Sequence, residues 1–416
     1  MSSFDIQATR AAFPALKKEQ VYFDNAGGSQ TLGTAIDSIH EYLIHTNVQL
    51  GGSYAVGKQT NQKYATGYEA AAKHINASKD NIVLGSSTTQ LFRNLSQALS
   101  FPAGSEIIIS SIDHEANIAS WVALASIQSL TIKWWNPSKS PNPSLTPDSL
   151  KPLLSSKTAL VTCTHASNIL GTIHDIAALS TLVHTIPNAL FCVDGVAYAP
   201  HRPLDMQALG VDFYCFSWYK VYGPHISVLY ASPAALPKLK SLAHFFNPSN
   251  TLSEKLGLAG SCYELTAALP AVVEYLDTQS WEGIRAHEEE LQKVLLEYLG
   301  SRKDVTIMGE KSWDAGKRVS TISFVVEGKG SRGVVESVDE ATDGLIGIRW
   351  GAFYSNRLCE EVLGLGKEGV VRVSMVHYNT GELAIFPSQL KHDANRIIVE
   401  EVKRLIEVFD KVLGKS

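Results

Sequence analysis

The stretch FSWYKVYGPHISVLY, Phe216–Tyr230, decides the fold prediction, and the rest of the chain is interpreted outward from it. It places Lys220 between a short apolar run, Phe213–Phe216, and an aromatic turn, Tyr222–Pro224. Lysines that only solvate a surface rarely lie directly behind a buried strand. Near-continuous apolar strands are typical of a parallel sheet covered by helices on both faces, and ligands bind at the carboxyl ends of such strands. Lys220 is therefore predicted to lie at the ligand-binding edge of a sheet.

Short apolar runs alternate with amphipathic stretches over the first two-thirds of the chain, which favours a doubly covered parallel sheet. Right-handed crossovers then place the carboxyl ends of the parallel strands along one edge. Seven runs are predicted as strands: Asn81–Leu84, Glu106–Ser110, Thr131–Trp134, Thr158–Thr162, Ala189–Val193, Phe213–Phe216 and Ile226–Tyr230.

Beyond Ala267 the pattern changes to a long helical span, Leu265–Leu299, followed by a second alternation. Its expected elements are three strands and a last helix: Val319–Val326, Gly344–Ile348, Val370–Ser374 and His392–Leu413. The predicted fold is α/β, with a large domain over residues 23–285 that holds a mostly parallel seven-stranded sheet. A smaller C-terminal α+β domain over 286–416 is joined to it by the N-terminal segment 1–22.

The composition narrows the class of protein. The 416 residues are 45% hydrophobic, and 36 basic against 41 acidic side chains give a formal net charge of −5. This is globular composition without the basic excess of a nucleic-acid-binding protein. No apolar stretch approaches the roughly 20 residues that span a bilayer, and the first residues lack a signal-peptide pattern. With five scattered cysteines, we expect a cytoplasmic protein without nucleic-acid or membrane partners and without a metal site.

Polar groups follow five of the predicted strands. The first is a helix-start motif, Gly85–Thr89, and the others are Asp113-His114-Glu115, His165–Asn168, Asp194-Gly195 and the segment with Lys220. Taken singly, each has an ordinary structural interpretation: an N-cap, a turn, a satisfied core histidine or a solvated lysine. Together they supply an anion cradle, an imidazole, a carboxamide, a carboxylate and an amine at one edge. That set matches the needs of pyridoxal phosphate.

These stretches, together with YFDNAGG (Tyr22–Gly28) and RVSMVHYNT (Arg372–Thr380), resemble the class V aminotransferase and cysteine desulfurase family of fold type I pyridoxal-phosphate enzymes. The resemblance implies a Schiff base on Lys220, Asp194 at the pyridine nitrogen and His114 stacked on the ring. Further cofactor contacts are implied for Ser87, Thr88, Thr89, Asn168, Ser217 and Tyr219. Gly260 and Ser261 resemble a pair that reaches the phosphate of a neighbouring subunit, which implies a homodimer with shared sites.

The substrate side is assigned by the same resemblance. Arg372 is expected to bind the substrate α-carboxylate, because a guanidinium matches a carboxylate with two parallel hydrogen bonds. The other residues expected on this side are Asn25, Gly27, Trp350, Phe353 and Tyr354. Aromatic side chains of this kind suit a bulky or cationic substrate.

Two departures from the family pattern bear on the reaction. Tyr219 stands where the family commonly has a histidine, and Tyr354 stands where desulfurases carry the sulfur-accepting cysteine. A tyrosine cannot attack sulfur as a thiolate does, and Cys359, five residues further on, is interpreted as structural. The resemblance extends to fungal epimerase-like proteins, including the loline-pathway type of Mannich cyclase. The first hypothesis is therefore an enzyme that forms an α-carbanion on an amino-acid-derived substrate and closes a ring by carbon–carbon bond formation in secondary metabolism.

Two other hypotheses remain open. The first is carbon–sulfur lysis by β-elimination, or a desulfurase-like activity, which uses the same α-carbon chemistry. The second rests on Gly328–Gly333, which fits G-x-G-x-x-G between a predicted strand and a helix-like run, Val334–Asp339. This motif is typical of dinucleotide-binding oxidoreductases, but it lies in the smaller C-terminal unit without parallel βαβ repeats around it.

Overall fold

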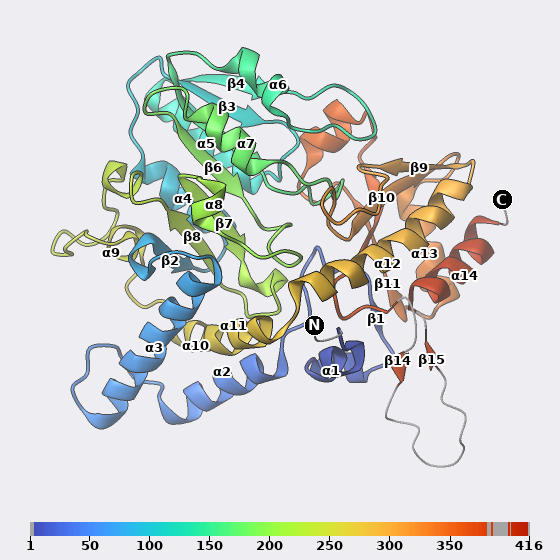
Figure 1. Cartoon of the computed structure of the whole chain (residues 1–416), viewed down its shortest axis with the longest axis horizontal. Helices are drawn as coiled ribbons and strands as arrows, with labels where there is room; N and C mark the ends of the chain where they lie inside the picture. The colour runs from blue at the N-terminus through green and yellow to red at the C-terminus, as the bar shows by residue number, and fades with distance from the viewer. Residues whose placement is uncertain (1–3, 381–383, 386–397, 400, 415–416) are drawn as a thin grey trace.

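The computed structural model describes residues 4–380, 384–385, 398–399 and 401–414. Its main feature is a seven-stranded sheet with the strand order β2-β8-β7-β6-β5-β3-β4 (Figure 1). The strands are β2 (Ile82–Gly85), β3 (Glu106–Ser110), β4 (Thr131–Trp135), β5 (Thr158–Thr164), β6 (Leu190–Asp194), β7 (Phe213–Ser217) and β8 (Ser227–Ala231). Each of the seven predicted strands is present, with its ends moved by no more than two residues.

The sheet is mostly parallel, as predicted. Strands β4, β3, β5, β6 and β7 pair in parallel, whereas β8 runs antiparallel to both of its neighbours, β7 and β2. The β8 strand is antiparallel because the chain turns back directly after the segment that carries Lys220, which leaves no room for a crossover helix.

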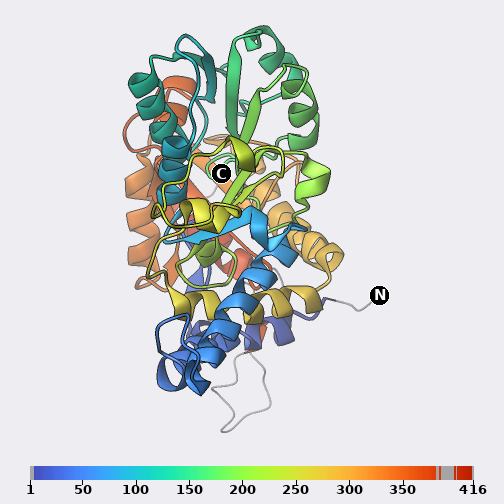
Figure 2. The same cartoon turned by 90° about the vertical axis from the view of Figure 1, so that its left-hand side faces the viewer.

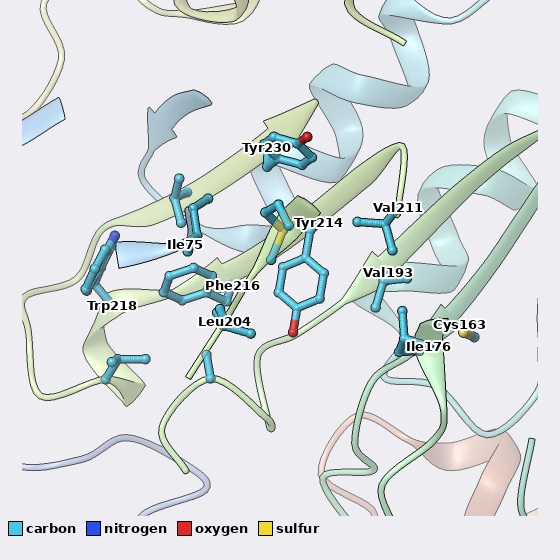
Figure 3. Packing of buried hydrophobic residues seen from close by; sticks show 14 of the residues in the cluster. Ile75, Cys163, Ile176, Val193, Leu204, Val211, Tyr214, Phe216, Trp218 and Tyr230 are labelled. Atoms are coloured by element: carbon cyan, nitrogen blue, oxygen red, sulfur yellow. The ribbon is translucent and has the colours of Figure 1, made fainter. Parts of the chain in front are cut away.

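Alternate residues of each strand pack against opposite layers of helices. On β7, Tyr214 and Phe216 join one buried cluster while Phe213 and Cys215 join another. Figure 3 shows part of the first cluster, where Tyr214, Phe216 and Trp218 lie beside one another. Burial on both faces explains why these strands are continuous apolar runs, and such runs can be recognised from the sequence alone.

Helices from several parts of the chain cover the two faces. The Tyr214 face packs against α3 (Ala55–His74), α7 (Ile176–Val183) and α11 (Leu269–Thr278). The other face packs against α4 (Thr88–Ala98), α5 (Ala116–Gln128) and α9 (Leu252–Leu256). The helices α2 (Gly33–His45) and α3 lie at the lower end of the molecule in both views (Figures 1 and 2). The shorter helices are α1 (Ile6–Ala11), α6 (Pro147–Leu150), α8 (Met206–Leu209) and α10 (Tyr263–Ala267).

A second sheet, with the order β12-β13-β10-β9, forms the core of the C-terminal unit and is antiparallel throughout. Its strands are β9 (Val305–Met308), β10 (Thr321–Val326), β12 (Arg349–Gly351) and β13 (Val370–Ser374). The helices α12 (Trp281–Ser301), α13 (Ser331–Ala341) and α14 (Glu401–Leu413) supply apolar residues to its own buried cluster. A short pair, β14 (Ala384–Ile385) and β15 (Ile398–Val399), precedes α14.

The N-terminal segment pairs with strands of this C-terminal unit and packs into its core. Strand β1 (Val21–Tyr22) pairs in parallel with β11 (Ile346–Gly347), and Asp24 forms a further bridge with Ser374. Val21 and Phe23 belong to the same buried cluster as β10 and α14. The predicted division between residues 285 and 286 falls inside α12, and the domain limits remain a prediction.

Three details of the sequence prediction are wrong. The helical span Leu265–Leu299 is divided, because α11 ends at Thr278 and Ser280 caps a new helix by accepting the Gly283 N–H. The last helix begins at Glu401 rather than His392, since Ile398–Val399 is a strand and residues 392–397 lie outside the described part of the chain. Gly344–Ile348 contains only the two-residue strand β11, and β9 and β12 were not predicted. Within the described ranges, no helix is long and apolar enough to cross a membrane.

Candidate active site

A cavity opens at the carboxyl ends of the parallel strands. Nine of the predicted cofactor-binding residues line it together: Ser87, Thr88, Thr89, His114, Asn168, Asp194, Ser217, Tyr219 and Lys220. Five further lining residues were missed because they are small or apolar and carry no chemical signal of their own: Ala116, Thr164, Ala166, Val196 and Ala197. The structure therefore brings together groups that lie on separate strands in the sequence.

Lys220 is the last residue of a short 3₁₀ turn, Trp218–Lys220, that directly follows β7. The buried Trp218 anchors this turn: its N–H donates to the Ile226 carbonyl at 2.8 Å, and its own carbonyl accepts from Gly223 at 2.9 Å. Burial lowers the pKa of the Lys220 amine to about 8, with Arg372 contributing in the same direction and Asp194 opposing it. A near-neutral pKa suits an amine that must bond covalently to a carbonyl and also transfer protons.

Asp194 ends β6 and is buried. Its Oδ1 accepts the Val196 N–H at 2.9 Å. Burial raises the pKa of this carboxyl to about 6, although the Val196 N–H and Lys220 lower it. A buried carboxylate of this kind fits a protonated ring nitrogen, which would pair with its negative charge. The next residue must be glycine, because a Cβ on Gly195 would lie 2.1 Å from the Tyr214 ring.

His114 presents a flat, neutral imidazole to the cavity. Its Nδ1 accepts the Ala116 N–H at 3.0 Å, which leaves the ring proton on Nε2. Burial lowers the pKa of His114 to about 4, and the positive charges of Lys220 and Arg372 act in the same direction. A neutral ring can stack on an aromatic cofactor without adding charge, as the family pattern implies.

The N-terminus of α4 forms the anion cradle. Ser87 caps the helix by accepting the Gln90 N–H at 3.1 Å. Thr88 Oγ1 lies 2.7 Å from Ser217 Oγ, which in turn lies 2.7 Å from Ser227 Oγ. The unpaired N–H groups and the positive end of the helix dipole favour a phosphate here, and the hydroxyls can add hydrogen bonds to it.

Tyr219 lines the cavity beside Lys220 and is held from two sides. Its carbonyl accepts the Ser29 N–H at 3.1 Å, and its ring stacks on His225 at 4.8 Å with an angle of 4°. The sequence did not single out His225, which is exposed. This stacked pair occupies the place of the histidine that the family commonly carries before the lysine.

Arg372 lies on β13 with a side chain that is only 2% exposed. Its Nη2 donates to Asp24 Oδ1 at 2.8 Å and its Nη1 to the Asn168 carbonyl at 3.3 Å. The ring of Phe353 covers the guanidinium at 3.6 Å. Burial lowers the pKa of Arg372 to about 10, so the group remains charged near neutral pH. Neither Asp24 nor its second partner, Arg349, was predicted, although Asp24 lies within the quoted YFDNAGG stretch.

The loop after β12 forms the rim above Arg372. Phe353 and Tyr354 both adopt left-handed backbone conformations, with φ of 49° and 60°. The Asn168 side chain holds this loop by donating to the Phe353 carbonyl at 3.1 Å and accepting from Ser355 at 3.0 Å. Tyr354 is 73% exposed, and its ring centroid lies 5.3 Å from that of His114. An exposed aromatic side chain therefore lies beside His114, at the position where the family pattern places a thiol in desulfurases.

Three residues expected on the substrate side lie elsewhere. The amide of Asn25 is buried and ties the N-terminal segment to Tyr22, Ser374 and Asn379. Trp350 lies on the face of the short strand β12 opposite to that of Arg349, because side chains alternate along a strand. It packs against the buried cluster of the C-terminal unit. Gly27 contacts the carboxylate of Asp24 rather than the cavity, and a Cβ there would lie 2.9 Å from Asp24 Oδ2.

The glycine-rich turn Gly328–Gly333 does not offer a phosphate site. The carboxylate of Glu368 lies at the start of α13, where its Oε2 accepts the Arg332 N–H at 3.4 Å, and Lys329 Nζ donates to the Val412 carbonyl at 2.9 Å. The sheet behind this turn is antiparallel. An acid at the helix N-terminus would repel a pyrophosphate, so the structure disfavours the dinucleotide hypothesis.

Comparison with known proteins decides the family. The family model described as Aminotransferase class-V matches residues 21–383. The chain belongs to the class V aminotransferase family. Its cofactor is pyridoxal phosphate, and the amine, carboxylate, imidazole and helix N-terminus described above fit that group.

Two curated fungal relatives cover nearly the whole chain. An aminotransferase-like protein of Gibberella zeae, FGM3, is 54% identical in an alignment of 419 positions that covers 99% of each chain. The cysteine desulfurase-like protein ustD of Aspergillus flavus is 41% identical and covers 94% of this chain and 91% of its own. Among solved structures, a cysteine desulfurase of Thermococcus onnurineus matches with a TM-score of 0.85, 23% identity and complete coverage of both chains. This class V chain therefore has the fold type I architecture that the sequence predicted.

The geometry assigns distinct tasks to the chain's own residues. When bound, pyridoxal phosphate withdraws electrons from the substrate α-carbon. Asp194 would hold negative charge at the ring nitrogen of the cofactor, and the α4 N-terminus would hold its phosphate. His114 would stack on the ring and exclude water from that side. Lys220, with its lowered pKa, would serve as the base that takes a proton from the α-carbon and returns it.

Proposed function

We propose that this enzyme removes the α-proton of an amino-acid-derived substrate and joins that carbon to a second reactant, closing a ring by Mannich-like carbon–carbon bond formation. The observation that carries the proposal is the exposed ring of Tyr354, whose centroid lies 5.3 Å from that of His114 in the Lys220 cavity, at the position where the family pattern would place a thiol. Asp194, His114 and Lys220 supply what α-carbon chemistry needs.

The aromatic side chains beside the cavity support the same reaction. The Tyr354 ring lies near His114 and the Phe353 ring lies against Arg372, and such rings attract a cationic second reactant such as an iminium. No cysteine belongs to the described residues that line the cavity, and Cys359 is buried in the π-helix Leu358–Val362. Burial raises the pKa of Cys359 to about 12, so it is not a ready thiolate. Bond formation at carbon needs no such group.

The experiment tests the proton step and the bond-forming step separately. A panel of amino acids is incubated with the holoenzyme in deuterated water, and loss of the α-hydrogen is followed by NMR. The same panel is then supplied with small aldehydes or cyclic imines, and products are identified by mass spectrometry. We expect α-exchange for the preferred amino acid and a new carbon–carbon product only with the second reactant. Exchange without any such product would reject the ring-forming reaction.

A second candidate is cleavage of a carbon–sulfur bond by β-elimination. It is favoured by the 41% identity to ustD, whose name includes cysteine desulfurase-like, and by the position of Lys220 as a base. With cysteine as substrate, elimination leaves pyruvate, whereas transfer of sulfur through a protein thiol leaves alanine. We expect pyruvate if any sulfur is released, and alanine with a persulfide on Cys359 would contradict both candidates.

We propose further that the enzyme is a homodimer with shared active sites. Gly260 and Ser261 lie outside the Lys220 cavity, and Ser261 borders a separate surface cavity, where its Oγ lies 2.9 Å from Tyr64 Oη. The adjoining segment exposes large apolar side chains, among them Phe245 at 99% and Phe246 at 70%. Exposed apolar patches of this kind favour association with another chain.

Light scattering after size exclusion tests the dimer, and subunit mixing tests the shared site. One inactive chain carries Lys220→Ala, and the other lacks the Ser261 hydroxyl and carries a bulky replacement of Gly260. When the two are mixed, activity should recover only if one subunit completes the site of its partner. A monomer, or the absence of any recovery in proven heterodimers, would contradict the proposal.

We also propose a cytoplasmic location for the enzyme. The proposal is supported by five free cysteines, four of them buried. Fractionation of the producing cell tests it.

A further inference from the structure

One carboxylate, that of Asp24, is shared by two arginines. Asp24 Oδ1 lies 2.8 Å from Arg372 Nη2, and Asp24 Oδ2 lies 3.2 Å from Arg349 Nη1. The backbone of Asp24 is fixed by its bridge to Ser374 on β13, two residues after Arg372. The side chain is nevertheless 28% exposed, so its carboxylate lies at the surface of the site.

The two terminal nitrogens of Arg372 are already paired, so an incoming carboxylate meets occupied hydrogen-bond positions. Asp24 occupies one edge of the guanidinium, the Asn168 carbonyl occupies another, and the Phe353 ring covers its plane at 3.6 Å. The Nε atom is buried without a hydrogen-bond partner in the described structure. Arg349 differs, because its side chain is 54% exposed. If Arg372 is to bind a substrate carboxylate, one of its present neighbours has to leave.

We propose that Asp24 is a specificity-determining residue that competes with the substrate carboxylate for Arg372. When substrate binds, its carboxylate replaces Asp24 on Arg372, and Arg349 retains the displaced Asp24. This inference rests on the proposed role of Arg372 in binding the substrate. Charge balance favours the exchange, since one carboxylate leaves the guanidinium as another arrives and Arg349 prevents Asp24 from being left without a partner.

The exchange also sets which ligands bind. The apparent affinity of a carboxylate is reduced by the fraction of enzyme in which Arg372 is open. The competition weakens every carboxylate by the same factor, but an amino acid gains further contacts from its amine at the Lys220 cavity. Asp24 therefore keeps small carboxylates, which bind weakly, from occupying the site, whereas an amino acid retains enough affinity to bind. Gly27 leaves the space beside Asp24 free, because a Cβ there would lie 2.9 Å from Asp24 Oδ2.

Propionate is the test ligand, because it carries a carboxylate and no amine and cannot react. Its binding to the holoenzyme is measured by calorimetry and as a competitive inhibition constant. Asp24→Asn should tighten propionate binding by about threefold or more, because Arg372 loses its internal competitor. Arg349→Gln should weaken it by a similar factor, because Asp24 then binds Arg372 more firmly. In the Asp24→Asn background, the effect of Arg349→Gln should disappear, since Arg349 acts only through Asp24.

The controls separate this inference from a general charge effect and from the proposed function. Lys293→Gln removes one exposed positive charge on α12 and should leave propionate binding unchanged. Weaker binding in Asp24→Asn would make Asp24 a permanent orienting group and overturn the inference. An Arg349 effect of equal size in both backgrounds would also overturn it, because Arg349 would then contact the ligand directly. Arg349 is exposed, so its variant stays informative even if Asp24→Asn does not fold.

The proposed function fails in a different way. Arg372→Lys should weaken propionate binding in every background if Arg372 is the carboxylate site. If Arg372→Lys has no effect on propionate while Asp24→Asn still changes it, the assignment of Arg372 is wrong. If α-exchange is absent but the Asp24–Arg349 coupling is found, the reaction is wrong and the competition stands.

Discussion

The site has a cofactor half and a substrate half that are built differently. The cofactor half comes from strand ends of one sheet and consists of Lys220, Asp194, His114 and Thr88. The substrate half joins segments as much as 348 residues apart and consists of Arg372, Asp24, Arg349 and Phe353. The first half is built of single side chains that face a cavity. The second half is a set of ion pairs and ring contacts that its residues make with one another. A cofactor bound for the life of the enzyme suits the first arrangement, and a ligand that comes and goes suits the second.

This difference predicts different outcomes of mutation. Changes in the cofactor half should remove the cofactor's properties or the chemistry itself. Changes in the substrate half should alter affinity and leave the cofactor in place. The experiments below test this division, beginning with the largest expected effect.

Lys220→Ala should lower turnover by at least about 1,000-fold, because the covalent link to the cofactor and the base are lost together. The visible absorbance of the holoenzyme and steady-state turnover are the measurements. Lys17→Ala, which removes an exposed lysine near the N-terminus, is the matched control and should change neither. A Lys220→Ala protein that keeps the visible band and its activity would place the cofactor elsewhere.

Arg372→Lys should raise the KM for the best amino-acid substrate by about 10-fold or more, since a charge-assisted guanidinium–carboxylate pair is worth roughly 1.5–3 kcal/mol and an ammonium recovers only part of it. The visible spectrum should be unchanged. Saturation kinetics and cofactor titration are measured in parallel. Equal losses of cofactor and substrate affinity would mean that the two halves are not separable.

Asp113→Asn should change the pH dependence of stability rather than chemistry. Asp113 is buried beside His114, and one of its oxygens accepts from Asn117 while the other has no partner in the described structure. Burial raises the pKa of Asp113 to about 8. Between about pH 4 and pH 8 the folded protein therefore holds a proton that the unfolded chain releases, so this group makes stability fall as pH rises.

The Asp113→Asn variant does not lose stability in this way as the pH rises, because its amide does not titrate. Its Tm relative to the natural protein should therefore rise by about 2–4 °C between pH 5 and pH 8. Differential scanning calorimetry of the cofactor-free proteins measures this shift, with the exposed Asp37→Asn as the control. A constant difference at all pH values would show that Asp113 is charged in the folded protein.

Cys359→Ala should have the smallest effect. The thiol is buried and its pKa is raised to about 12, so turnover with every substrate should stay within about twofold. Loss of the buried sulfur should cost only about 1 kcal/mol of stability. Turnover assays with cysteine and with the best substrate provide the test, and a selective loss with cysteine would restore a sulfur-transfer role for this residue.

The same division explains how much could be predicted from the sequence. Thr88, Asp194, Ser217 and Lys220 each follow a continuous apolar run, so the sheet rule alone placed them at one edge, and the seven strands were found for the same reason. Trp350 could not be placed, because the short strand β12 was not predicted and its alternation decides which way the ring points. Asn25 was misjudged because its partners, Ser374 and Asn379, are distant in sequence and carry no local pattern. Long-range pairing decides those contacts.

The pairing of β1 with β11 also determines when the site can form during synthesis. Val21 cannot meet Ile346, and Asp24 cannot meet Ser374, until those later residues have left the ribosome. The strands of the seven-stranded sheet end at Ala231, so this sheet can assemble earlier. A chain cut short after the large sheet would keep the strands that carry the cofactor-binding groups and lack Arg372 altogether. The growing chain therefore acquires the ability to select a substrate later than the ability to hold the cofactor.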